Sequence, residues 1–482
     1  MTEKSADLGE LPHGWIRTQL GEIAEVILGQ SPPSSSYNED GKGLPFYQGK
    51  LEFGRLYPTP RKWCTAPKKI AQKGDILISV RAPVGPTNVC PEESCIGRGL
   101  AAIRGLGGIG TLFILYFLRA FENEIARRGT GTTFSAIGGD QLKKLEIPLP
   151  PLNEQVRIVG RVEELFACLD AGVEGLRKVK AQLKRYRQAV LKYAFEGKLT
   201  EEWRKTHKNQ LEPATKLLER IKQERKKDPK YKELPPIDVF NPVELPENWT
   251  WTRLGEVVFL SNERYNPTIS EDERFVGLEH IQSDTGNLLG FGKSSETRST
   301  KNRFKQGDLL YGKLRPYLNK VWVANFNGVC STDILVFQKN DFISNEYLAA
   351  CLLNQSFVEY TNQHMSGVQH PRVSYQILSQ YIVPLPPLLE QLEIAEEAQR
   401  SFSVADEVER ATEQNLKKAE FLRQSILKVA FEGKLVPQDP SDESAEKLLE
   451  RIREEREKST GEKDINKKKN KPKQLELSTY VK

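Results

Sequence analysis

Two long stretches of the chain carry apolar residues at every third or fourth position, and this spacing predicts two long helices. Residues 152–196 and 388–432 each run for 45 positions without an internal proline. A repeat of threes and fours is typical of a coiled-coil seam. Each helix would measure on the order of 65 Å, at about 1.5 Å per residue. The expected seam positions are Ile158, Val162, Leu165, Leu169, Val173, Leu176, Val179, Leu183, Tyr186, Val190 and Ala194 in the first helix, and Ile394, Ala398, Phe402, Ala405, Thr412, Leu416, Ala419, Leu422, Ile426 and Ala430 in the second.

The residues at both ends of these stretches support the same interpretation. A Pro-Leu-Pro-Pro segment precedes each stretch, and a helix does not readily extend back through prolines because they lack the backbone donor. Gly197 and Gly433 follow the last helical positions, where a left-handed C-terminal cap usually lies. Because the chain must return to begin a second globular segment, we expect the helices to pack antiparallel, with the two globular units at opposite ends.

The chain contains nearly the same sequence twice. LPHGWIRTQLGEI at residues 11–23 recurs as LPENWTWTRLGEV at 245–257, and PLPPLNEQ at 148–155 recurs as PLPPLLEQ at 384–391. RQAVLKYAFEGKL at 187–199 recurs as RQSILKVAFEGKL at 423–435, and KLLERIKQERKK from Lys216 recurs as KLLERIREEREK from Lys447. Two copies of about 236 residues are too long to be the units of a solenoid. We therefore expect a duplicated half-molecule with an internal pseudo-two-fold repeat.

The two globular segments differ in sequence but share the same expected elements. Each begins with a tryptophan-bearing strand and contains a strand that starts with Gly-Asp, KGDILISV at 73–80 and QGDLLYGK at 306–313. β-Branched and aromatic runs separated by glycine and proline predict further strands, and one helix is expected in each segment, near 112–127 and 345–363. The fold class is therefore α+β, with two strand-rich domains joined by two long antiparallel coiled-coil helices. The expected boundaries are 1–150 for the first globular domain, 151–197 for the central helix, 198–243 for a charged helical linker, 244–386 for the second globular domain, 387–433 for the C-terminal long helix, and 434–482 for a charged helix with a disordered basic tail.

Composition and charge narrow the class of protein. Lys and Arg outnumber Asp and Glu by 71 to 65, a formal net charge of +6, which neither requires nor excludes a polyanionic partner. The longest apolar run, residues 111–118, ends at Arg119 and is far shorter than the roughly 18 residues of a membrane span. The first residues of the chain lack the apolar core of a signal peptide. The sequence predicts a soluble, cytoplasmic protein without a membrane partner.

Motifs for catalysis and for cofactor binding are incomplete. GLGGIG at 105–110 matches the glycine pattern of a dinucleotide site, but the second copy has no glycine at the corresponding place. GDLLYGKL from Gly307 carries Leu314 where a phosphate loop needs serine or threonine to hold magnesium. The six cysteines contain no CxxC pair and the five histidines form no ligand pair, so neither a disulfide scaffold nor structural zinc is expected. We expect no catalytic residue, no cofactor site and no metal site in this chain.

The duplicated PLPPLxEQ segments, the long helices that end in AFEGKL and the Gly-Asp strands together resemble the specificity (S) subunits of Type I restriction-modification systems. The resemblance covers nearly the whole chain. It implies that each globular domain is a target-recognition domain that reads one half of a bipartite sequence in double-stranded DNA, and that the paired helices set the unread spacer. It also implies two methyltransferase (M) subunits that bind S-adenosylmethionine and methylate adenine, and restriction (R) subunits that use ATP and Mg. The chain itself would be non-catalytic.

The polar loops and the Gly-Asp strands supply the candidate DNA-binding residues. Side chains read base edges, whereas phosphate contacts fix the register. The loops before the PLPP segments, RRGTGTTFSAIGG and HMSGVQHPRVS, are rich in glycine, hydroxyl and basic groups. The tail near 463–473 could touch phosphates, although a disordered solubilising tail is the main expectation. The candidates are Gln48, Lys50, Arg55, Arg81, Arg98, Arg128, Thr130, Thr133 and Ser135 in the first domain, and His280, Lys313, Arg315, Tyr317, Lys320, His370, Arg372 and Ser374 in the second.

Two other functions stay open from the residues alone. A structural scaffold would bind proteins at its two globular ends and show no DNA specificity. A standalone enzyme would use the glycine-rich segment near Gly105. Duplex binding that weakens steeply as salt rises would favour the DNA-reading function, because binding releases counterions from the phosphates.

Overall fold

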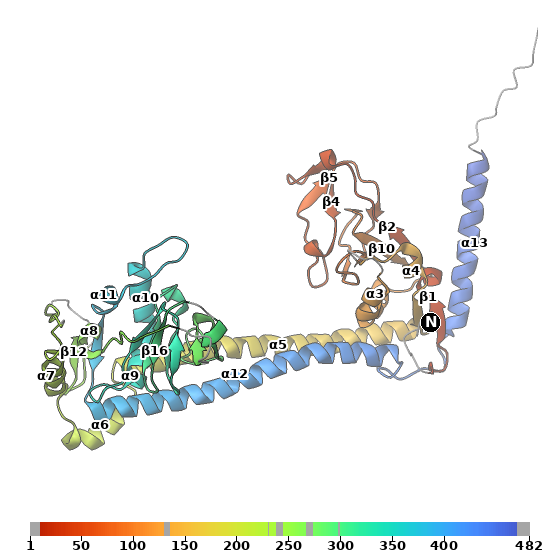
Figure 1. Cartoon of the computed structure of the whole chain (residues 1–482). Coiled ribbons are helices and arrows are strands. Elements are labelled where there is room, and N and C mark those ends of the chain that lie inside the picture. Colours follow the sequence, from red (N-terminus) through yellow and green to blue (C-terminus); the bar gives the residue numbers. More distant parts are fainter. Residues whose placement is uncertain are drawn as a thin grey trace, which may run out of the picture. The chain divides into compact units, whose positions relative to one another are not determined.

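The computed structural model describes residues 10–129, 135–229, 231–237, 244–266, 273–296 and 299–469. The chain forms two compact units, coloured by sequence in Figure 1. Unit 1 comprises Met1–Gly175 and Asn415–Lys482, and unit 2 comprises Leu176–Gln414. Unit 1 is therefore assembled from both ends of the sequence, whereas unit 2 is formed by its middle.

Unit 1 contains three sheets and several short helices. A four-stranded antiparallel sheet consists, in order, of β2 (Ala24–Leu28), β10 (Leu100–Gly105), β7 (Ile76–Ser79) and β8 (Thr87–Val89). A five-stranded mixed sheet consists of β3 (Tyr37–Asn38), β5 (Lys62–Cys64), β4 (Leu44–Tyr47), β9 (Ser94–Ile96) and β6 (Ile70–Ala71), and β1 (Ile16–Gln19) pairs with β11 (Glu146–Leu149). The helical elements are α1 (Leu20–Ile23), α2 (Thr111–Ala120), α3 (Glu122–Arg128), α4 (Gly139–Lys143), η1 (Ser34–Ser36) and η2 (Lys50–Glu52).

Unit 2 repeats this plan with its own set of elements. A three-stranded sheet consists of β18 (Val321–Val323), β17 (Leu309–Gly312) and β20 (Ile334–Phe337), and β12 (Thr250–Arg253) pairs with β21 (Ile382–Leu385). A five-stranded sheet consists of β13 (Arg264–Tyr265), β16 (Lys301–Phe304), β19 (Gly328–Cys330), β14 (Arg274–Val276) and β15 (Gly292–Lys293). The helical elements are α6 (Glu201–His207), α7 (Ala214–Arg225), α8 (Leu254–Val257), α9 (Asn345–Leu353), α10 (Gln355–His364), α11 (Tyr375–Leu378), η3 (Lys208–Gln210), η4 (Leu278–His280), η5 (Ser294–Glu296) and η6 (Pro316–Leu318).

The central strand pairings are the same in the two units, but the edge strand differs, because β3 pairs with β5 in unit 1 whereas β13 pairs with β16 in unit 2. β4 is parallel to β9 in unit 1, and β14 is parallel to β19 in unit 2. The predicted Gly-Asp strands are β7 and β17, each preceded by a glycine with a φ of 88°, Gly74 and Gly307. The following aspartates cap their own turns, since Asp75 and Asp308 each accept a backbone N–H bond of 2.8 Å from three residues earlier. The expected α+β class with two strand-rich domains is confirmed.

One helix was expected in each globular segment, but each segment contains two consecutive helices. α2 is followed by α3, and α9 is followed by α10. In unit 2 the break lies at Asn354, whose extended backbone is incompatible with a continuous helix and whose side chain accepts an N–H bond of 3.0 Å from Ser356. Asparagine favours such N-cap positions because its side chain competes for backbone donors.

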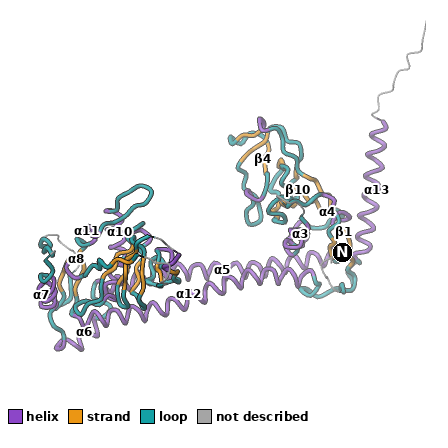
Figure 2. Tube along the Cα trace, in the orientation of Figure 1, coloured by secondary structure: helices purple, strands orange, loops and turns teal. Residues whose placement is uncertain are grey.

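The two long helices agree closely with the sequence prediction. α5 (Leu152–Phe195) and α12 (Leu388–Phe431) each contain 44 residues and run without interruption in Figure 2. Each is followed by the expected glycine, with a φ of 69° at both positions. Within unit 2, Lys180 lies 2.6 Å from Glu413 and Arg187 lies 2.6 Å from Asp406. Later residues of α5 therefore pair with earlier residues of α12, which confirms the antiparallel packing.

One expected seam position in each long helix is wrong. Tyr186 and Leu422, which occupy equivalent places in the two copies, are 44% and 51% exposed. The arginine that follows each of them turns inward instead. Arg187 is 7% exposed, and the guanidinium of Arg423 lies over the ring of Phe166, 4.7 Å from its centroid. Apolar periodicity missed these positions because the opposite helix supplies an aspartate that allows an arginine to enter the seam.

The PLPPLxEQ segments have the same structural role in both units. The indole of Trp15 donates to Glu154 at 3.0 Å, and that of Trp249 donates to Glu390 at 2.8 Å. The glutamine after each glutamate donates to a proline carbonyl five residues earlier, at 2.9 Å in both cases. Both carboxylates are buried. The motif therefore fastens the start of each long helix to the tryptophan-bearing segment of the same unit.

A charged helix follows each long helix and packs onto its own unit. In unit 2, Arg225 of α7 donates to the carbonyl of Val258. In unit 1, Arg456 of α13 (Ala445–Lys469) donates to the carbonyls of Gly21 and Ala24 at 2.8 and 3.2 Å. Part of the predicted basic tail, up to Lys469, is thus helical, and residues 470–482 lie outside the described part of the chain. None of the described helices is both long and apolar enough to cross a bilayer.

Candidate nucleic-acid interface

Four candidates of the first domain meet at one pocket in unit 1, here called the polar pocket. Gln48 follows β4, Lys50 begins η2, Arg81 follows β7 and Arg98 precedes β10, and all four line a cavity of about 370 Å³. All four residues are exposed. Their side chains form no hydrogen bond or ion pair with any other described residue. The fold therefore brings together polar groups that are up to 50 positions apart in the sequence.

The other candidates of the first domain lie outside this pocket. Arg55 pairs with Asp170 of α5, and the guanidinium of Arg128 lies 2.7 Å from the carboxylate of Glu124. Ser135 is exposed. Thr130 and Thr133 lie outside the described residues. The two arginines thus have structural partners, and their predicted role in binding DNA stays a prediction.

In both units, the loop after the Gly-Asp strand is bridged to the loop before the PLPP segment. Arg81 forms an isolated antiparallel bridge with Ala136 in unit 1, and Leu314 forms one with Arg372 in unit 2. The backbone N–H of Arg315 also donates to the carbonyl of Pro371 at 2.7 Å. Candidate residues from two separate loops therefore share one edge of each unit.

Two candidates of the second domain, Arg372 and Ser374, stabilise this loop. Arg372 donates from Nε and Nη2 to the two carboxylate oxygens of Asp333, at 3.0 and 3.1 Å. These hydrogen bonds raise the pKa of Arg372. Ser374 caps α11 by accepting the N–H bond of Ile377 at 3.3 Å. Both side chains are therefore engaged within the domain.

Two further candidates, His280 and Lys320, hold the end of β14 in place. His280 accepts the N–H bond of Gly277 at 2.9 Å. The ammonium of Lys320 donates to the carbonyls of Leu278 and Ile281 at 2.7 and 2.6 Å, and burial lowers the pKa of Lys320, although Glu279 acts in the opposite direction. The side chains of Lys313, Arg315, Tyr317 and His370 form no hydrogen bond or ion pair with other described residues. These four form the part of the predicted set that is open to a ligand in unit 2.

The arrangement suits recognition better than covalent chemistry. Burial raises the pKa of the Cys90 thiol to about 11 and those of Cys95 and Cys351 to about 12, so these thiols are not nucleophilic thiolates at neutral pH. No group of His, Cys, Asp and Glu within the described ranges could hold a metal ion. The glycine-rich segment 105–110 packs against α13, since a side chain on Gly107 would collide with Ile452.

A family model of the Type I restriction modification DNA specificity domain matches residues 12–179 and 246–418. The chain belongs to this family. Each match begins just before a tryptophan-bearing segment and extends into a long helix. The two specificity domains therefore correspond to the two copies found in the sequence.

Individual relatives resemble the chain over most of its length. It is 31% identical over 472 residues to the type I restriction enzyme EcoDI specificity subunit of Escherichia coli, covering 95% of this chain and 99% of the relative. It is 26% identical to the EcoKI specificity subunit of Escherichia coli strain K12, over 95% of this chain and 99% of that protein. Among solved structures, the HsdS subunit from Thermoanaerobacter tengcongensis is 50% identical over 34% of this chain and 40% of that chain, with a TM-score of 0.31.

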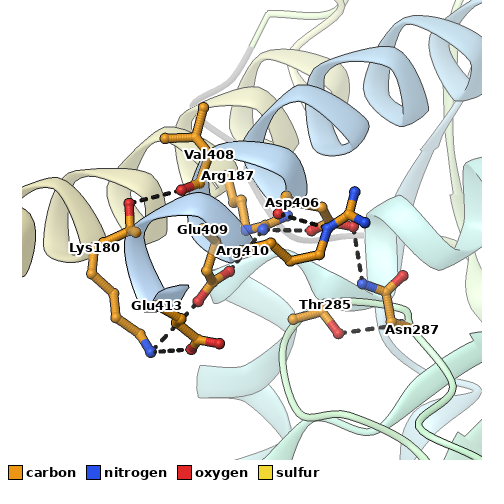
Figure 3. Close-up of polar contacts among 10 residues, drawn as sticks. Lys180, Arg187, Thr285, Asn287, Asp406, Val408, Glu409, Arg410 and Glu413 are labelled. Atoms are coloured by element: carbon orange, nitrogen blue, oxygen red, sulfur yellow. Dashed lines mark hydrogen bonds and ion pairs between the residues drawn. The ribbon is translucent and has the colours of Figure 1, made fainter. Parts of the chain in front are cut away.

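In the second specificity domain, Asp406 of α12 contacts both the opposite helix and the globular part, as Figure 3 shows. Arg187 of α5 lies 2.6 Å from Asp406 and 3.0 Å from Glu409. From the globular part, the amide of Asn287 donates to Asp406 at 3.2 Å. Thr285 accepts the backbone N–H bond of Asn287 at 3.2 Å, which orients this loop toward the helix. One carboxylate thus joins three segments of the domain.

The first specificity domain has the same joint with a different partner from the globular part. Asp170 of α5 lies 236 positions before Asp406 and pairs with Arg423 of α12 and with Arg55. Sequence reasoning missed both aspartates. The available signal was that the two aspartates and their arginine partners on the opposite helix recur at the same separation of 236 residues as the motifs.

Proposed function

We propose that this chain is the DNA-specificity subunit of a Type I restriction-modification complex, in which each globular domain reads one half of a bipartite target in double-stranded DNA. The observation that carries the proposal is the occurrence of two specificity domains in one chain. They share their central strand pairings but present different polar groups to a ligand. One scaffold with two surfaces is suited to two different half-sites, since loops carry recognition while the scaffold keeps its shape.

The first domain presents its candidates at the polar pocket, and the second presents them on the loops around η6 and His370. Arg, Lys and Gln are the side chains that reach base edges and phosphates most often. The aromatic ring of Tyr317, 45% exposed, adds a flat apolar surface in the second domain. The difference between these surfaces supports two unlike half-sites rather than a palindrome.

The long helices would set the unread spacer between the half-sites. Each specificity domain is fastened to them at two places, the Trp–Glu contact and the aspartate joint. Two methyltransferase subunits would dock on the helices and supply adenine methylation with S-adenosylmethionine, and restriction subunits would add ATP- and Mg-dependent cleavage. In this proposal the chain itself carries no catalytic residue and directs the chemistry of its partners.

A domain exchange tests this function directly. Replacing residues 1–147 with those of a relative, in a host that supplies the methyltransferase subunits, should change one half of the split methylated motif and leave the other half unchanged. The measurement is genome-wide methylation mapping before and after the exchange. A protein-binding scaffold would leave the motif unchanged, and replacement of both halves would refute modular reading.

A further inference from the structure

We infer that the polar pocket of unit 1 binds base edges of the first half-site, and that Arg81 or Arg98 reads a guanine there. The inference rests on the proposed function, because it assumes that duplex DNA lies against unit 1. A guanidinium group matches the O6 and N7 acceptors of guanine in the major groove. Gln48 at the same pocket has the amide that suits the edge of adenine.

The η2 side of the pocket has a fixed backbone and unengaged side-chain ends. The carboxylate of Glu52 accepts N–H bonds from Gly49 at 3.1 Å and from Gln48 at 3.4 Å. This turn positions Gln48 and Lys50 beside the cavity without engaging their side chains. The carboxylate of Glu52 is thus occupied by backbone donors.

On the other side of the pocket, the backbones of Arg81 and Arg98 are also fixed by hydrogen bonds. The hydroxyl of Ser79 donates to the carbonyl of Arg81 at 3.0 Å, and the backbone N–H of Arg98 donates to Ser31 at 3.3 Å. Each contact uses the backbone of the arginine and leaves its guanidinium group exposed. Recognition groups on a fixed backbone lose little conformational entropy on binding. This arrangement is expected of a specificity site and is not needed for folding.

The charge of the pocket favours a nucleic acid over a neutral ligand. Its lining includes three basic residues, Lys50, Arg81 and Arg98, and no acidic residue among those described. A second cavity of about 600 Å³ adjoins it and shares Gln48 and Lys50. This second cavity is also lined by Glu52, whose carboxylate accepts the two backbone N–H bonds described above.

Two basic side chains on the matching loops of unit 2 form internal contacts instead. Beside η4, which follows β14 as η2 follows β4, the ammonium of Lys320 bonds to the carbonyls of Leu278 and Ile281. On the loop before the PLPP segment, Arg372 is bound to Asp333 through two hydrogen bonds. Lys320 and Arg372 thus have internal partners in unit 2, whereas Arg81 and Arg98 of unit 1 have none among the described residues.

The test compares the variants Arg81→Ala and Arg98→Ala with the control Arg61→Ala, in the full chain together with its methyltransferase subunits. Arg61 is an exposed arginine of the same unit that does not line the pocket. Competition binding uses duplexes substituted at one base pair at a time. We expect at least one pocket variant to lose about 10- to 100-fold of its preference for guanine at a single position of the first half-site, with the second half-site and the spacer unchanged.

Other outcomes contradict the inference. Uniform weakening across all duplexes, with a smaller salt dependence, would assign the arginines to phosphates. Unchanged preferences in both pocket variants, or a change in the second half-site, would also overturn it. Failure of the proposed function looks different, because the wild-type complex would then show no preference for any split sequence.

Discussion

An aromatic pair joins the globular part to the long helix in the first specificity domain, whereas a groove lies at the equivalent place in the second. In the first, Tyr116 of α2 lies edge-on against Phe166 of α5, with ring centroids 5.7 Å apart. In the second, the equivalent of Tyr116 is Ala350, and Ala395 and Ala398 replace valines on the helix. These small residues line a groove of about 780 Å³. The second domain therefore lacks this aromatic pair, although Ile394 and Phe402 of α12 still pack against its buried cluster.

The buried Trp–Glu contacts differ in the opposite direction. Glu390 accepts hydrogen bonds from Trp249, from Thr200 at 2.8 Å and from Arg204 at 2.7 Å. Glu154 accepts one from its tryptophan, and its other oxygen has no partner among the described residues. Each domain is thus stabilised on its helix by a different route, through polar bonds in the second and aromatic packing in the first. The Trp–Glu contact is thus present in both domains, but the interactions that reinforce it differ.

The largest difference in stability between variants of the two domains is expected when Glu390 and Glu154 are each replaced by glutamine. Glu390→Gln leaves the guanidinium of Arg204, which is 14% exposed, without a charged partner, and we expect a loss of about 3 to 5 kcal/mol in the free energy of unfolding. Glu154→Gln removes no ion pair and should change stability by less than about 1 kcal/mol. Urea denaturation of the full chain measures both. Equal losses in the two variants would contradict the asymmetry.

Removing the aromatic contact should affect the first domain next most strongly. Tyr116 is 6% exposed, so Tyr116→Ala creates a cavity and should cost about 3 kcal/mol. The complementary variant Ala350→Tyr places a ring where the groove already has space, and it should cost less than about 1 kcal/mol. Calorimetry of both variants provides the measurement. If Ala350→Tyr proved as destabilising as Tyr116→Ala, the groove would not be the counterpart of the packed contact.

The long helices could be predicted from the sequence because their formation depends on local periodicity and on the proline and glycine at their ends. The positions of Arg187 and Arg423 in the seam could not, since they depend on a carboxylate from the opposite helix. In the candidate site, too, some features could be predicted from the sequence and others depend on the fold. Composition identified the basic loops, but only the fold brings Gln48 and Arg98 to one cavity and gives Arg372 an internal partner.

The smallest expected effect concerns the pH dependence of the first domain. Burial raises the pKa of Glu154 above its ordinary value of 4.5, and the Trp15 hydrogen bond opposes this only in part. Arg157 and Asp442 also face this carboxylate with opposite charges, and they pair with each other at 2.7 Å. Because the folded pKa is the higher one, the contribution of Glu154 to stability is complete below the unfolded pKa and is lost as pH rises through the folded pKa.

The stability of the wild type should therefore contain a component that falls as pH rises above about 4.5, worth about 1.4 kcal/mol for each pH unit that separates the folded and unfolded pKa values of Glu154. Thermal unfolding followed across this pH range measures it, and Glu154→Gln should remove it. Glu163→Gln, an exposed substitution on the same helix, is the matched control and should leave the profile unchanged. Val436 of unit 1 is the counterpart of Thr200 of unit 2, 236 positions earlier in the chain, so Val436→Thr offers the unpartnered oxygen a hydroxyl donor. That variant should stabilise the protein at neutral pH by about 1 kcal/mol. It should also reduce the fall in stability with rising pH that Glu154 causes. If neither Glu154 nor Val436 affected the profile, the missing donors would not account for the difference between the two domains.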